Sequence, residues 1–145
     1  MMPKTYRRGV GSRLVDVVFR TLTRLGLGRK DRYLLTVRGR RSGRPLSTPV
    51  DVIDEGGARW LVAAYGVSGW VRNVRADAEV TIARGGRSEA VRAVEVGPRE
   101  GVPVLRRYLL EVPVTRPYFA VTLASTDEEF AAESQRHPVF RLEPR

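Results

Sequence analysis

The 145-residue chain contains no cysteine and a single histidine, His137. The lack of cysteine excludes a disulfide framework, a thiol nucleophile, a cysteine-ligated zinc ion and an iron–sulfur cluster. A single histidine also argues against a histidine metal site and a Ser-His-Asp triad, and we assign His137 no role. The chain is long enough to bury a core of its own, so one domain over residues 1–145 is expected.

Long apolar runs are missing as well. No stretch approaches the roughly 20 consecutive apolar residues that cross a bilayer. The N-terminal segment is interrupted by Arg13, Asp16, Arg20 and Arg24, which is not the pattern of a secretory signal. We therefore expect a cytoplasmic protein whose residues 1–11 form a flexible basic leader.

Acidic residues are scarce in the first third of the chain. Residues 1–44 carry 13 Lys or Arg against two acids, whereas residues 45–145 carry 13 against 14 acids. Arginine makes up 24 of the 26 basic residues; a GC-rich genome would explain that choice but not its uneven placement. The asymmetry indicates a partner with several negative charges: nucleic acid, an anionic membrane or an anionic cofactor.

Residues 12–28 have the period of an amphipathic helix. Apolar residues recur on one face, at Leu14, Val18, Leu22 and Leu25, while arginines fall elsewhere. Such a helix either covers one side of a core or lies on an anionic membrane. Association with the inner face of the cell membrane is therefore a second expectation for the location.

Strand-like and helix-like segments alternate through the rest of the chain. Strands are expected at residues 32–39, 44–55, 58–66, 79–85, 87–97 and 138–144, and helices at 68–78, 98–112 and 125–137. Pro103 would suit the first turn of the second helix, and Ser125 or Thr126 would cap the third. Residues 113–125 fit neither pattern clearly. Short turns between most strands predict an α+β fold: a small, mostly antiparallel β-barrel with covering helices.

The turn Gly39–Arg44, with the sequence GRRSGR, holds several kinds of anion donor. Glycine allows positive φ and close backbone approach, and successive N–H groups in such a turn form an anion nest. The arginine fork matches phosphate or carboxylate oxygens. A solvated hairpin turn would tolerate the same residues, so both interpretations stay open on the residues alone.

A second segment of interest covers residues 62–82. Ala63, Ala64 and Gly66 end a strand with small residues that leave room for a flat group. Trp70 and Asn73 lie three apart and share a face of a short helix. Trp70 would equally serve as a core anchor and Asn73 as a turn residue.

Four short motifs follow one another with compatible spacing: Gly39–Gly43 as G-R-[RK]-S-G, Thr48-Pro49-Val50 as Thr-Pro-apolar, Ala63-Ala64 as Ala-[AS], and Trp70–Ala76 as W-x-x-N-[LV]-x-A. None is diagnostic alone, but the four in order are fairly specific. Over residues 30–96 the chain resembles the deazaflavin-dependent nitroreductase family. Members of that family bind coenzyme F420 on a split β-barrel, an FMN-binding-like fold.

The resemblance implies a binding role for each motif. Coenzyme F420 carries a phosphate and an oligoglutamate tail, and the family's arginine turn holds that anionic end, here through Arg40, Arg41, Ser42, Gly43 and Arg44. The strand residues Pro49, Val50 and Asp51 would line the deazaflavin edge. Those that would pass close to the ring are Ala63, Ala64, Tyr65 and Gly66, and those that would close the pocket are Trp70, Arg72 and Asn73.

The implied activity is hydride transfer from reduced F420 to an apolar acceptor such as a quinone, with nitro-aromatics as side substrates. The cofactor carries the chemistry, so no metal is required. Candidate proton donors or substrate contacts are Tyr65, Tyr108 and Tyr118, although each would also suit core packing. Ala64 stands where some family members have a serine thought to help bind the acceptor, which argues against nitroimidazole reduction.

Two other interpretations stay open. Split barrels also bind FMN, whose phosphate an arginine-rich turn could hold. A non-enzymatic module that binds anions or nucleic acid would also explain the charge. Nucleic acid is not expected, because aromatic residues do not alternate with the arginines of residues 38–44 and no nucleic-acid signature is present.

Overall fold

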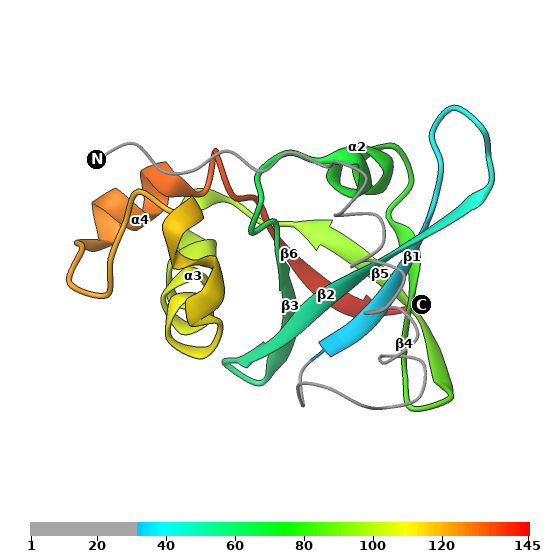
Figure 1. The fold of residues 1–145 in the computed structure, drawn as a ribbon, viewed down its shortest axis with the longest axis horizontal. Coiled ribbons are helices and arrows are strands. Elements are labelled where there is room, and N and C mark those ends of the chain that lie inside the picture. Colours follow the sequence, from blue (N-terminus) through cyan, green and yellow to red (C-terminus); the bar gives the residue numbers. More distant parts are fainter. Residues whose placement is uncertain (1–31) are drawn as a thin grey trace.

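The computed structural model describes residues 32–145. The leader expected at residues 1–11 and the helix expected at 12–28 lie outside the described residues. Within them, six strands form a barrel and helices flank it (Figure 1). No helix in this part of the chain is long and apolar enough to cross a membrane.

The strands and helices fall close to the expected positions. The strands are β1 (Arg32–Arg38), β2 (Pro45–Glu55), β3 (Ala58–Val62), β4 (Glu79–Arg84), β5 (Arg87–Glu95) and β6 (Val139–Pro144). The helices are α2 (Gly69–Ala76), α3 (Pro98–Glu111) and α4 (Asp127–Glu133), and residues Pro113–Tyr118, which fit no clear pattern in the sequence, form a 3-10 helix, η1.

Strand β6 closes the barrel. The strand order is β1-β2-β3-β6-β5-β4, with β4 pairing back to β1, and every pair is antiparallel. The C-terminal strand therefore inserts between β3 and β5, which gives every strand a partner on both sides for at least part of its length. The expected small antiparallel barrel with covering helices is confirmed.

Alternate side chains of the strands pack into two separate cores. Leu61 and Ala63 face the barrel interior with Phe140 of β6, while Trp60 and Val62 face outward into a second core. Side chains of α3, η1 and α4 complete that second core, and Figure 1 shows α3 beside β3 with α4 on the other side of α3. The period of two along a strand thus assigns each residue to one of the cores.

Strand β2 extends well beyond its partner β3. Residues 45–51 of β2 pair only with β1, and only Val52–Glu55 pair with β3. The free half explains how Pro49 fits inside a strand, because its missing N–H faces no neighbouring strand. The β1–β2 hairpin consequently projects from the barrel (Figure 1), and its tip carries the turn Gly39–Arg44.

Two expectations need correction. Helix α3 begins at Pro98, so Pro98 takes the first-turn position and Pro103 lies inside the helix on an exposed face. Strand β3 ends at Val62 rather than at Gly66, because Gly66 adopts φ = +87° and its N–H donates to the carbonyl of Ala63. Residues 63–66 therefore form a turn at the end of the strand.

Helix α4 begins with a capping box. The Thr126 hydroxyl accepts from the Glu129 N–H at 3.2 Å, and the Glu129 carboxylate accepts from the Thr126 N–H at 2.9 Å. These bonds lower the pKa of Glu129. They fix where α4 starts, which in turn fixes the position of the residues that follow its last turn.

Replacing Thr126 by Ala removes the capping acceptor and is expected to lower the free energy of unfolding by about 1 kcal/mol. Thr126→Ser retains the hydroxyl and serves as the control. Urea unfolding of the two variants measures the difference, and equal stabilities would contradict a capping role.

Candidate functional site

The turn Gly39–Arg44 is held by its own backbone. The Gly39 N–H donates to the Arg44 carbonyl at 2.8 Å, and the Gly43 N–H donates to the Gly39 carbonyl at 2.9 Å. Gly43 has φ = +71°, and a Cβ on Gly39 would lie 2.7 Å from Ser42 Oγ. Both glycines are thus needed for the shape of the turn. Ser42 Oγ accepts from the Arg44 N–H at 3.1 Å, so the serine first serves the turn itself.

Asn73 anchors this turn to α2. Its Oδ1 accepts from the Arg40 backbone N–H and from Arg40 Nη1, each at 2.9 Å. Asn73 is buried, so this amide oxygen is a fixed point for the projecting hairpin. The sequence interpretation gave Asn73 and Arg40 to the ligand, whereas the structure shows them bonded to each other.

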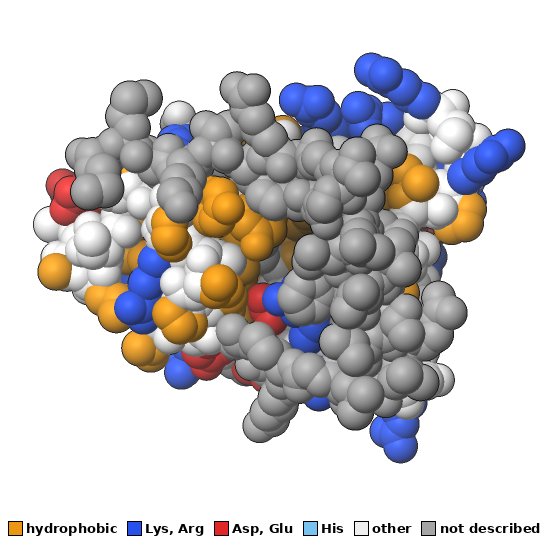
Figure 2. Space-filling view, viewed as in Figure 1, with side chains coloured by type: hydrophobic (Ala, Val, Ile, Leu, Met, Phe, Trp, Pro, Cys, Tyr) orange, Lys and Arg blue, Asp and Glu red, His pale blue; other side chains and the backbone are white. Residues whose placement is uncertain are grey.

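Arg41 and Arg44 are exposed at the tip of the turn, and within residues 32–145 their guanidinium groups have no hydrogen-bond or ion-pair partner. At least ten other arginines of the described chain lie within 4.0 Å of a carboxylate. Figure 2 shows the basic side chains gathered over the projecting hairpin at the upper right. The positive charge of the turn is therefore uncompensated and available to an anionic ligand.

The remaining residues expected near the ligand are less exposed to solvent than Arg41 and Arg44. Pro49 is half-buried on β2, and Val50 and Asp51 are buried. Asp51 lies 3.6 Å from the guanidinium of Arg32 on the neighbouring strand. All three lie on the half of β2 that pairs only with β1.

Ala63 and Ala64 belong to the two cores. Ala63 packs inside the barrel and Ala64 packs in the second core, with 1% and 6% of their surfaces exposed. The outer surface of this turn is formed instead by Tyr65, which is 47% exposed, and by Val67, which is 37% exposed. Because both side chains are small, consecutive residues of the chain fit into two different cores at this point.

The three candidate tyrosines occupy two different environments. Tyr65 and Tyr118 meet edge to face with ring centroids 4.9 Å apart. Tyr108 is 3% exposed within the second core, where burial raises the pKa of its hydroxyl well above the usual value. A hydroxyl in that position has no access to a surface-bound acceptor, so the structure places Tyr108 with the packing residues.

Helix α2 contributes a packing residue and an exposed cation. Trp70 packs against the barrel core with its ring 5.6 Å from that of Phe140. Arg72 is exposed, and its side chain has no partner among the described residues. Figure 1 places α2 between the β1–β2 hairpin and the segment that follows β3, and Arg72 precedes Asn73, the α2 residue that bonds to the turn.

His137, to which we assigned no role from the sequence, is buried and contacts the backbone of two segments that are distant in the chain. Its Nδ1 lies 2.8 Å from the Ala63 carbonyl oxygen and its Nε2 lies 2.9 Å from that of Tyr118. The ring stacks on Phe119, and Nε2 lies 3.4 Å from the carboxylate of Glu133. Burial lowers the pKa of His137, while these carbonyls and Glu133 act in the opposite direction. The i,i+4 spacing of Glu133 and His137 was the only sequence signal for this pair.

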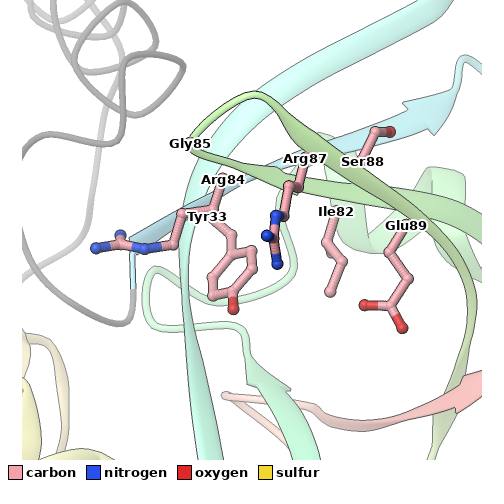
Figure 3. Close-up of a pocket in the computed structure, with 7 residues that line it drawn as sticks. All are labelled: Tyr33, Ile82, Arg84, Gly85, Arg87, Ser88 and Glu89. Atoms are coloured by element: carbon pink, nitrogen blue, oxygen red, sulfur yellow. The ribbon is translucent and has the colours of Figure 1, made fainter.

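A surface pocket of about 540 Å³ lies elsewhere, at the β4–β5 hairpin. Its lining, shown in Figure 3, consists of Tyr33, Ile82, Arg84, Gly85, Arg87, Ser88 and Glu89. None of these belongs to the four motifs. No cluster of metal-ligating side chains occurs within residues 32–145.

Solved structures share this fold at low sequence identity. An F420-H2 dependent reductase, FDR-A, is 24% identical with a TM-score of 0.55, over 79% of this chain and 95% of that one. A NimC/NimA family protein from Clostridium acetobutylicum is 13% identical with a TM-score of 0.53, over 92% and 81%. The haem storage protein HutZ from Vibrio cholerae is 13% identical with a TM-score of 0.51, over 89% and 87%. Their names differ in function, so these likenesses show the fold alone.

Sequence comparison is more specific. A search of curated proteins gives no match. Residues 13–130 match the family described as F420H(2)-dependent quinone reductase. The resemblance seen in the motifs was to a nitroreductase family with the same coenzyme, and the matched family supports the coenzyme without naming a nitro substrate. Because the match spans most of the chain, the protein belongs to the F420H2-dependent quinone reductase family and is an oxidoreductase that uses coenzyme F420.

Proposed function

We propose that the protein transfers a hydride from reduced coenzyme F420 to an apolar acceptor of the quinone class, with nitro-aromatics as side substrates. The observation that carries the proposal is the turn Gly39–Arg44. Its two outermost arginines lack a partner within residues 32–145, whereas at least ten other arginines of that part of the chain lie within 4.0 Å of a carboxylate. An anionic cofactor tail is the ligand that such a turn fits.

The residues of the turn have separate tasks in this proposal. Arg41 and Arg44 bind the anionic tail, and the exposed Arg72, next in sequence to the Asn73 that holds the turn, adds a third cation. Arg40 has a different task, because Asn73 holds both its N–H and its guanidinium. Arg40 and Asn73 therefore orient the turn while the outer arginines make the ligand contacts.

Hydride transfer is the chemistry that reduced F420 supplies when it is bound. A quinone that receives a hydride needs one proton to become the hydroquinone. In this proposal the hydroxyl of Tyr65 or Tyr118 donates it, and the edge-to-face contact of the two rings keeps these side chains together. Tyr65 is 47% exposed, so the donating group can recover its proton from solvent.

The apolar character of the acceptor agrees with two further features. Val67 is an exposed apolar residue on the segment that follows Tyr65. The basic amphipathic pattern of residues 12–28 would bring the protein to an anionic membrane in which apolar acceptors dissolve. Ala64 stands where some related proteins carry a serine, which favours quinones over nitroimidazoles as acceptors.

Replacing Arg41 and Arg44 together by Ala is expected to weaken F420 binding at least about tenfold. Each charge-assisted hydrogen bond contributes about 1.5–3 kcal/mol, and 1.4 kcal/mol corresponds to a factor of ten. Fluorescence titration with F420 measures the change, and raising the salt concentration should narrow the gap between variant and wild type.

The matched control is the double variant Arg87→Ala with Arg99→Ala. It removes the same charge from exposed positions outside the turn and should bind F420 like the wild type. Equal losses in both variants would mean a general electrostatic effect. A wild type that binds FMN in preference to F420 would contradict the proposal outright.

Replacing Asn73 by Ala should weaken F420 binding although every arginine stays in place. The Arg40 N–H would lose its only acceptor among the described groups, and the turn would lose its fixed orientation. Asn73→Asp keeps the accepting oxygen and should bind nearly as well as the wild type. Hydrogen exchange of the Arg40 amide reports the anchoring directly, and unchanged protection in Asn73→Ala would contradict it.

The tyrosine assignment predicts a kinetic difference between hydroxyls. Tyr65→Phe or Tyr118→Phe should lower kcat with a quinone about 100-fold or more, the usual contribution of a positioned proton donor, while the F420 dissociation constant stays unchanged. Tyr108→Phe is the control, because that hydroxyl is buried in the second core. It should alter thermal stability and leave kcat near the wild-type value; a loss confined to Tyr108→Phe would reverse the assignment.

A further inference from the structure

His137 joins three elements that are distant in the sequence. It follows α4, its Nδ1 faces the Ala63 carbonyl at the end of β3, and its Nε2 faces the Tyr118 carbonyl at the end of η1. The ring is 2% exposed and stacks on Phe119 at 3.9 Å between centroids. No step of the proposed reaction uses this histidine, so its bonding needs its own explanation.

Both contacts of the ring require hydrogen on nitrogen. A carbonyl oxygen only accepts, so Nδ1 and Nε2 each have to donate for both bonds to form. Both bonds therefore form only in the protonated, positively charged ring, which the carboxylate of Glu133, 3.4 Å from Nε2, favours and which burial disfavours. The charged side chains that face the ring are Glu133 and Arg136, while the ends of β3 and η1 present backbone carbonyls.

Glu133 extends the same junction. Its Oε2 accepts from the Ala120 N–H at 3.1 Å, and its Oε1 lies 3.0 Å from Arg136 Nη1. The carboxylate therefore holds the chain just after η1 while the imidazole holds η1 itself. Three segments meet at one buried pair of side chains, which leaves little freedom in their relative positions.

The residues next to the two bonded carbonyls are the tyrosines of the proposed site. Tyr65 lies two residues after Ala63, and its turn is set by the Gly66 N–H, which donates to the same Ala63 carbonyl at 3.0 Å. Tyr118 itself provides the second carbonyl. The edge-to-face contact of the Tyr65 and Tyr118 rings thus joins two segments that His137 ties together.

We propose that His137 is a positioning residue, whose two ring N–H groups tie the carbonyls of Ala63 and Tyr118 together and so hold Tyr65 and Tyr118 beside the electron acceptor. The inference rests on the proposed function, because it gives these tyrosines their role on the acceptor side. It assigns His137 no contact with coenzyme or acceptor.

Three variants separate the contributions of the ring. His137→Asn places an amide nitrogen near the position of Nδ1 and can keep the bond to Ala63. His137→Gln places one near the position of Nε2 and can keep the bond to Tyr118. His137→Phe keeps a flat ring against Phe119 and loses both bonds. F420 binding and thermal unfolding of each full-length variant show whether it folds.

The variants are expected to turn over the acceptor more slowly while they bind the coenzyme as the wild type does. His137→Phe should lower kcat with a quinone about 100-fold, the loss that a displacement of about 1 Å of a reacting group produces, while its F420 dissociation constant stays within about twofold of the wild type. His137→Asn and His137→Gln should fall between these limits. In the wild type, kcat should fall as the pH rises through the lowered pKa of His137, because the neutral ring donates only one of the two bonds. The variants have no imidazole at this position, so their pH profiles should lack this decrease.

A second readout does not need turnover. A nuclear Overhauser contact between the Tyr65 and Tyr118 rings is expected in the wild type and should be lost in His137→Phe. A retained contact with unchanged acceptor kinetics in a folded His137→Phe variant would overturn the proposal. If the wild type binds F420 but reduces no quinone, the proposed acceptor fails, and the ring contact still tests whether His137 positions the tyrosines.

Discussion

The pairing of β6 with both β3 and β5 is the constraint on which the other features of the molecule depend. It closes the barrel and separates the side chains of β3 into an inner and an outer core. It also brings His137, just before β6, against the end of β3. A barrel without edges can leave one hairpin projecting, because the remaining strands do not need that hairpin for their hydrogen bonds.

Ion pairs between arginines and acids are spread over the wall of the barrel. Arg59 and Arg75 each make a bidentate contact with a glutamate on β5, and Arg141 contacts both Glu100 and Glu143. These exposed pairs contribute little stability individually, but they neutralise charge over the barrel wall. At the tip of the β1–β2 hairpin, Arg41 and Arg44 have no such partner among the described residues, and the proposed anion site rests on this contrast.

The fold and the matched family carry different parts of the functional conclusion. Structures of similar shape bear names as different as a reductase and a haem storage protein, so the barrel alone determines no chemistry. The coenzyme comes from the family that matches residues 13–130. The geometry then divides the residues expected at the site into exposed unpaired cations, an anchor for the turn, core residues and a tyrosine pair.

The sequence by itself indicated most strand and helix positions, a turn rich in anion donors and the coenzyme, because period-two and helical patterns, glycine positions and clustered arginines are local signals. It did not distinguish Asn73 as an anchor from Asn73 as a ligand contact, nor the buried Tyr108 from the exposed Tyr65. Those assignments depend on which distant segments meet. The role of His137 was decided only by the tertiary structure, since its partners lie 74 and 19 residues away along the chain.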